Sequence, residues 1–307
     1  MHLVIGAGGF TGSHAAAAVA RHAEVRTVEP WDDDMAGAMA GVEFVHLAAQ
    51  LRSPFEIPRG RGPHPFLILI VDLACRAGVR RLVYLSSASV LGSSHDVRVS
   101  ERTRPNPEHA YERALAADET WLRERDAPEV VVLRPAQGFG PGEPVSSRLI
   151  ERLRGGSLPL PGGGTAPRTF LAGADLGRAF HAAAVRGQPG MAYLLGGVRG
   201  CWRELVWTAA EALRITPRLA SSSYDAAYLA AAARLPRSGL SRECWPTPFL
   251  VDLLARPQVV DDGWSRRELG WQPEVTSFAA GLTGLTGRPA PAPDAEMVTA
   301  RRVRTLT

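Results

Sequence analysis

The stretch MHLVIGAGGFTG, residues 1–12, decides the fold. Residues 3–5 form an apolar run without polar alternation, which predicts a short strand buried on both faces of a parallel sheet. Four glycines follow, and the alanine-rich stretch after them predicts a helix over residues 13–22. In this order, Gly6 permits a tight turn and Gly12 lets the helix lie close to the sheet.

Such a turn presents backbone amides to an anion. The helix would aim its N-terminal N–H groups and its dipole at a phosphate, and Gly9 leaves no side chain where a pyrophosphate would contact the backbone. A second strand is predicted over residues 24–28, and Glu29 ends it near the spacing at which an acid accepts hydrogen bonds from ribose hydroxyls. The pattern predicts a dinucleotide site; the alternative is a glycine-rich turn without a ligand.

Glu29 also indicates which dinucleotide is expected. A carboxylate hydrogen-bonds a free 2′-hydroxyl and repels a 2′-phosphate, so NAD is favoured over NADP. Arg26 lies three residues earlier and should point to the opposite face of the strand. The alternative for Glu29 is a solvated strand end.

The rest of the chain alternates between strand and helix patterns. Further strands are predicted over residues 42–47, 81–85, 130–133 and 191–195, and helices over residues 65–77, 108–125, 147–154, 175–185, 202–214 and 225–234. This alternation predicts an α/β fold: a Rossmann-type doubly wound parallel sheet with a smaller, mainly helical C-terminal substrate lobe. Residues 31–41 leave little room for a usual third strand, which should be short or missing.

The same patterns divide the chain into two parts. The dinucleotide-binding domain is expected over residues 1–145 plus about 167–200, and the substrate lobe over about 146–166 plus 201–287. Residues 288–307 are rich in proline and alanine and are expected to form a flexible tail.

Composition excludes several classes of protein. The 307 residues are 45% hydrophobic, as in globular proteins with a real core, but no apolar run could cross a bilayer and the start does not resemble a signal peptide. The net charge of +4 comes from scattered arginines, so an anionic small molecule is expected and nucleic acid is not. Cys75, Cys201 and Cys244 fit no metal spacing and are expected to be small buried residues in a reducing cytoplasm.

Several segments together resemble one family. They are GAGGFTG at 6–12, HLAA at 46–49, SSASVLG at 86–92, LRPAQGFGPG at 133–142, RTF at 168–170 followed by DL at 175–176, and ELGWQP at 268–273. In this order they resemble the extended short-chain dehydrogenase/reductases of the NAD-dependent sugar epimerase/dehydratase type, over residues 1 to about 282. The resemblance implies an NAD-binding enzyme for a sugar nucleotide or related small metabolite, which can carry phosphate, with a homodimer as one option.

The resemblance also implies site residues. Those expected at the cofactor are Gly6, Gly8, Gly9, Phe10, Thr11, Gly12, Glu29, Leu47, Ala48, Ala49, Tyr111 and Pro135. Those expected at the substrate are Ser87, Gln137 and Arg168. In the family's chemistry, the Ser87 hydroxyl would polarise the substrate oxygen, Tyr111 would transfer the proton, and a lysine one helical turn later would grip the nicotinamide ribose and lower the pKa of the tyrosine.

The lysine position is occupied by Leu115, and the sequence contains no lysine at all. An ordinary tyrosine has a pKa near 10, so about one part in a thousand is phenolate at pH 7. Arg113, two residues after Tyr111, points elsewhere around the helix and is a poor substitute. The sequence therefore predicts slow redox chemistry or a redox-neutral step, such as elimination or cyclisation, with Tyr111 as acid. The alternative is a catalytically silent dinucleotide-binding sensor or assembly protein.

Other interpretations stay open for individual residues. Ser87 can be a helix cap, and Tyr111 can be a packing residue. Arg168 is either a phosphate ligand or a surface salt-bridge partner. Asp175 is expected to cap the helix that it begins. The histidines at 46 and 109 are expected to be structural rather than catalytic.

Overall fold

The structure is a computed structural model that describes residues 1–55, 62–92, 98–155, 158–234 and 246–285. The predicted tail at 288–307 and Cys244 lie outside these residues.

The centre of the molecule is a six-stranded parallel sheet in the order β10-β6-β4-β3-β1-β2. Its strands are β1 (His2–Ile5), β2 (Val25–Val28), β3 (Phe44–Leu47), β4 (Arg81–Leu85), β6 (Glu129–Pro135) and β10 (Ala192–Leu195). The predicted strands all form, with bounds shifted by at most two residues, and the α/β Rossmann-type prediction is confirmed.

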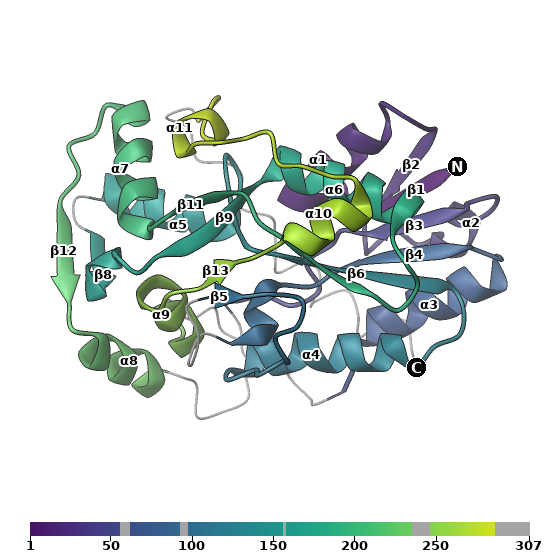
Figure 1. Cartoon of the computed structure of the whole chain (residues 1–307), viewed down its shortest axis with the longest axis horizontal. Coiled ribbons are helices and arrows are strands. Elements are labelled where there is room, and N and C mark those ends of the chain that lie inside the picture. Colours follow the sequence, from purple (N-terminus) through teal and green to yellow (C-terminus); the bar gives the residue numbers. More distant parts are fainter. Residues whose placement is uncertain (56–61, 93–97, 156–157, 235–245, 286–307) are drawn as a thin grey trace.

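Helices cover both faces of this sheet. α1 (Phe10–Val19) and α6 (Gly173–Arg186) lie over one face, and α3 (Pro65–Arg76) and α4 (Ala110–Arg123) over the other (Figure 1). Because side chains alternate along a strand, Val4 packs into the apolar cluster of α1 and α6, whereas Leu3 and Ile5 join that of α3. α1 begins three residues earlier than predicted, since Gly9 is already its N-cap.

The sheet ends at β2 in the part of the chain that the structure describes. The segment after β2 contains the short helix α2 (Met35–Ala38), and Asp34 accepts a hydrogen bond from the Gly37 amide at its start, at 2.8 Å. The expectation that the usual third strand would be short or missing is confirmed for these residues.

The remaining elements form small sheets and helices. The small sheets pair β11 (Val198–Gly200), β9 (Arg168–Ala172) and β7 (Gln137–Phe139); β12 (Leu219–Ser222) and β8 (Leu158–Pro161); and β13 (Val259–Val260) and β5 (Arg98–Val99). The helices are η1 (Ala88–Leu91), α5 (Pro144–Arg154), η2 (Gly162–Gly164), α7 (Trp202–Leu213), α8 (Tyr224–Ala233), α9 (Pro248–Ala255), α10 (Gly263–Leu269) and α11 (Phe278–Gly281). In Figure 1, α5, α7 and α8 gather beyond the end at which β6 leads into β7.

The cysteine prediction was wrong for one residue. Cys75 is exposed on α3, where its thiol donates to the Ala127 carbonyl at 2.9 Å, because position 75 falls on the outer face of the helix. Cys201 is partly exposed. No helix among the described residues combines the length and the hydropathy needed to span a membrane.

Candidate functional site

The glycine-rich loop lies at the carboxyl end of β1 and depends on two of its glycines. Gly6 has a φ of +88°, and a Cβ there would stand 2.7 Å from the Ala49 Cα. A Cβ on Gly12 would clash with the Gly6 carbonyl. Gly9 is the N-cap of α1 and offers no side chain to the first amides of the helix. The loop is therefore closed against the protein and leaves the start of α1 available to an anion.

Glu29 is brought to this loop from the end of β2. Its Oε1 accepts a hydrogen bond from the Gly8 amide at 2.6 Å. A Cβ on Gly8 would stand only 3.0 Å from that oxygen. Arg26 is directed elsewhere, since its Nη1 donates to the carbonyls of Ala38, at 2.6 Å, and Ala40, at 3.1 Å.

The other predicted residues follow the strand ends. Leu47 ends β3, and Ala48 donates from its amide to the Ile5 carbonyl at 3.2 Å. Pro135 ends β6, and Thr11 lies in the first turn of α1. Gln137 donates to the Gly138 carbonyl at 2.9 Å and to the Glu143 Oε1 at 3.3 Å. The carboxyl ends of parallel strands are the usual ligand-binding edge of such a sheet.

Phe10 links the glycine loop to the segment after β6. Its ring lies beside Gly138 and Gly140, where added Cβ atoms would stand 3.5 and 3.6 Å from it. The ring of His14 meets that of Phe10 edge-on, with centroids 5.1 Å apart. The side chain of Phe10 thus packs against β7 (Gln137–Phe139) and the residue that follows it.

Tyr111 lies in the first turn of α4. Its side chain is buried against Phe249, with ring centroids 4.7 Å apart, and its hydroxyl lies 3.5 Å from the Gln50 amide nitrogen. Burial, the largest influence, raises the pKa of Tyr111 to about 12. Leu115 is buried in the same apolar cluster and brings no charge. Arg113 is exposed and donates to the Glu108 carbonyl at 2.6 Å.

Ser87 caps η1, the short helix against which α4 packs. Its oxygen accepts a hydrogen bond from the Ser89 amide at 3.1 Å. The capping interpretation is therefore confirmed. It leaves the second role open, because a hydroxyl that accepts one bond still carries a hydrogen to donate.

Arg168 is not on the surface, so the surface salt-bridge alternative was wrong. Only 3% of its area is exposed, because β9 places it against Gln258. Its guanidinium donates to the Arg256 carbonyl at 3.0 Å and to the Gln258 Oε1 at 3.4 Å. Burial lowers the pKa of Arg168 to about 10. Within the described residues it forms no ion pair, and its Nε has no hydrogen-bond partner.

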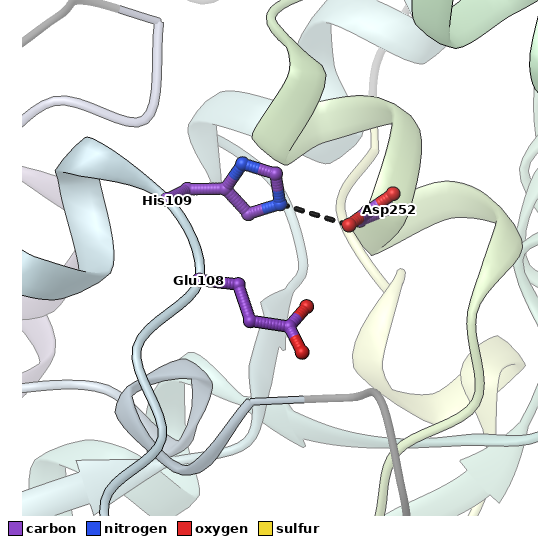
Figure 2. Close-up of side chains that lie close together, drawn as sticks. All are labelled: Glu108, His109 and Asp252. Atoms are coloured by element: carbon purple, nitrogen blue, oxygen red, sulfur yellow. Dashed lines mark hydrogen bonds and ion pairs between the residues drawn. The ribbon is translucent and has the colours of Figure 1, made fainter.

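A polar cluster missed by the sequence reasoning joins α4 to α9. Figure 2 shows Glu108, His109 and Asp252 facing one another; the His109 Nε2 lies 2.8 Å from the Asp252 Oδ2. Tyr224 donates to the other Asp252 oxygen at 2.6 Å. Arg256 Nη1 lies 3.1 Å from Glu108 and 3.5 Å from Asp252, so the guanidinium supplies the positive charge among these carboxylates.

Asp175 does not cap α6, and that expectation was wrong. The N-cap is Ala172, which makes no side-chain cap. Asp175 is the third residue of the helix and is buried, and its oxygens accept from the amides of Glu274, at 2.9 Å, and Val275, at 3.2 Å. It also pairs with Arg178. The carboxylate therefore serves the backbone of a distant segment rather than its own helix.

Two consecutive buried acids on α4 were also missed. Asp118 accepts from the Arg52 Nε and Nη2 at 3.1 and 2.9 Å, and from the Tyr84 hydroxyl at 3.0 Å. Glu119 pairs with Arg134, with Nε to Oε1 at 3.0 Å and Nη2 to Oε2 at 2.5 Å. The only signal in the sequence is that two acids fall on a helix face otherwise expected to be apolar.

Comparison with known proteins agrees with this architecture. Residues 67–196 match the profile of the NAD dependent epimerase/dehydratase family. An uncharacterized protein, y4nG, of Sinorhizobium fredii is 31% identical over 218 residues, which are 68% of this chain and 53% of that protein. The dTDP-D-glucose 4,6-dehydratase of Mus musculus is 31% identical over 135 residues, 42% of this chain and 38% of that protein. The chain thus spans about half or less of the length of these relatives.

Solved structures share the fold over nearly the whole chain. The UDP-glucose 4-epimerase of Thermotoga maritima, solved with UDP-glucose, superposes with a TM-score of 0.69 at 19% identity and covers 91% of this chain and 96% of that one. The dTDP-glucose 4,6-dehydratase of Streptomyces venezuelae, solved with NAD, superposes with a TM-score of 0.65 at 21% identity, covering 90% and 92%. At these identities the likeness shows the fold alone.

Proposed function

We propose that this protein binds NAD and catalyses a redox-neutral reaction of the epimerase/dehydratase type on a nucleotide sugar, with Tyr111 as the proton donor. The observation that carries the proposal is the glycine loop at the end of β1, with Glu29 hydrogen-bonded to it at 2.6 Å and the N-terminus of α1 left without a side-chain cap. The division into a dinucleotide-binding part and a substrate lobe belongs to the same proposal.

The residues around the loop fit NAD. The first amides of α1 can bind the pyrophosphate, as in other dinucleotide sites of this design. One carboxylate oxygen of Glu29 accepts a hydrogen bond from the Gly8 amide, and the other can accept one from a ribose hydroxyl. Arg26 is occupied by the carbonyls of residues 38 and 40, so it does not offer a cation to the 2′-phosphate of NADP. NAD, when bound, supplies a nicotinamide that accepts and returns hydride.

The proposed substrate carries phosphate. The structural neighbours named above were solved with UDP-glucose or are dTDP-glucose dehydratases. In this chain Arg168 is a buried guanidinium whose Nε has no hydrogen-bond partner in the described part of the structure. A planar guanidinium that keeps one N–H without a partner is suited to a phosphate oxygen. Ser87 and Gln137 are the proposed polar contacts to the rest of the substrate.

The state of Tyr111 favours proton donation over proton abstraction. With a pKa of about 12, roughly one molecule in a hundred thousand carries the phenolate at pH 7. Tyr111 can therefore give a proton to a leaving or developing oxygen, whereas it is a rare base. This is why we place elimination or cyclisation before net oxidation.

The second candidate function is a silent NAD-binding sensor or assembly protein, and Leu115 favours it. Calorimetry with NAD and NADP, followed by NMR analysis of products from UDP-glucose and dTDP-glucose, separates the candidates. We expect NAD binding, measurable turnover, and loss of turnover in Tyr111→Phe. NAD binding with no product from either sugar nucleotide would favour the silent protein. No binding of either dinucleotide at millimolar concentration would refute both.

A further inference from the structure

We propose that Gln50 is a further catalytic residue, whose side-chain amide donates a hydrogen bond to the phenol oxygen of Tyr111. In this chain Leu115 occupies the position of the lysine in the family pattern. The inference rests on the proposed role of Tyr111. The amide nitrogen lies 3.5 Å from the hydroxyl, and the bond joins residues 61 positions apart. Gln50 is exposed, whereas the side chain of Tyr111 is buried.

Asp118 anchors the segment that carries Gln50, of which residues 50–55 and 62–64 are described. Two residues after Gln50, Arg52 is buried and bound by both Asp118 oxygens. Arg52 also donates to the Gly62 carbonyl at 3.1 Å, and the His64 amide donates to Asp118 at 2.6 Å. One carboxylate of α4 therefore holds both described ends of the segment. Asp118 is two turns after Tyr111 on α4. The same helix therefore positions both the phenol and the segment that carries Gln50.

Residues 54 and 55 of the same segment contact α9 and α5. The Thr247 hydroxyl, at the start of α9, donates to the Pro54 carbonyl at 3.1 Å. Phe55 is buried, and the Arg148 guanidinium of α5 lies 4.6 Å from its ring centre. Because these contacts hold the residues directly after Gln50, its amide approaches Tyr111 from an anchored segment rather than from a free loop.

The Gln50 amide can stabilise a negative phenol oxygen on Tyr111, which the nearby charges disfavour. Glu112 and Glu143 both disfavour a negative phenol oxygen, and Leu115 offers no compensation. The Gln50 hydrogen bond acts in the opposite direction and lowers the pKa of Tyr111 relative to its value without that bond. When Tyr111 passes its O–H proton to a substrate oxygen, the O–H bond breaks and the phenol oxygen becomes negative. The Gln50 N–H then bonds that oxygen until it regains a proton from the substrate or water.

The experiment measures the titration of residue 111 directly. A fluorinated tyrosine placed at position 111 by amber suppression brings the phenol into an accessible pH range, and ¹⁹F NMR follows that residue alone. Loss of one hydrogen bond to a charged oxygen is worth about tenfold in the equilibrium. Gln50→Leu should thus raise the titration midpoint by about one pH unit, and Gln50→Glu by more. The matched control is Gln188→Leu, an exposed glutamine that bonds Glu268 instead and should leave the midpoint unchanged.

An unchanged midpoint in Gln50→Leu, or an equal change in Gln188→Leu, would overturn the inference. Turnover of the sugar nucleotide supplies the second readout: kcat should fall about tenfold in Gln50→Leu with little change in KM. A shifted midpoint with full kcat would also overturn a catalytic role. If NAD binds but the parent protein gives no product, the proposed function fails, and the ¹⁹F titration alone decides whether Gln50 tunes the phenol.

Discussion

Acidification should destabilise this protein through His46. The side chain is fully buried in β3, its Nε2 lies 2.8 Å from the His2 Nδ1, and its own Nδ1 has no partner among the described residues. Burial first, then the neighbouring histidines at 2 and 181, lowers the pKa of His46 to about 3. An added proton would thus place a charge in the interior, where no acid of the described residues acts on His46.

The sign and size follow from the two states. An unfolded chain takes up this proton near pH 6.5, whereas the folded protein resists it down to about pH 3, so stability falls as the pH falls below about 6.5. Between pH 7 and pH 5 the loss from His46 alone is about 2 kcal/mol. Because His2 shares the hydrogen bond and its pKa is lowered to about 4, the loss measured for the pair should be at least that large.

Urea unfolding followed by circular dichroism at pH 8, 7, 6 and 5 measures this slope. His46→Asn should be less stable at pH 8, but its unfolding free energy should change by about 2 kcal/mol less between pH 7 and pH 5. Thr120→Ala, at an exposed position of α4, is the control that should keep the parent slope. The reasoning would be refuted if His46→Asn retained the full pH dependence.

Three further predictions concern single contacts. Arg52→Met should cost about 3–5 kcal/mol in urea unfolding, since it leaves Asp118 buried without its cation, whereas removal of the exposed Arg76 should cost under about 1 kcal/mol; equal losses would contradict this. Glu29→Arg should shift the ratio of the NAD and NADP dissociation constants, measured by calorimetry, towards NADP by at least about tenfold. An unchanged ratio would show that Glu29 does not contact the dinucleotide. Phe249→Ala should cost about 3–5 kcal/mol by cavity formation, and a thermal midpoint equal to the parent's would be inconsistent with its burial.

The central sheet could be predicted because its signals are local. Strands such as β1 and β6 contain short uninterrupted apolar runs, at residues 3–5 and 130–133. Such runs, bounded by turn residues, are typical of strands buried on both faces of a sheet. The small strands β7 and β11 could not be found this way. Each has three residues with a glycine among them, and they form because β9 lies between them.

The candidate site divides in the same way. The glycine loop is contiguous, so its residues could be named from the sequence, and the acid at the end of β2 follows at a usual spacing. Gln50 and Asp252 could not be assigned, because their partners Tyr111 and His109 lie 61 and 143 positions away. Arg168 shows the limit from the other side: its motif was visible, but burial depends on how β9 packs.

The early end of the sheet at β2 has a consequence for behaviour in concentrated solution. An edge strand with free N–H and C=O groups can template a strand of another molecule and start edge-to-edge aggregation. Here the edge has only four residues, and Arg26 on it is drawn to the carbonyls beside α2. A short edge strand that carries a charged residue disfavours pairing with a strand of another molecule. The sheet therefore ends one strand early without exposing an edge that promotes aggregation.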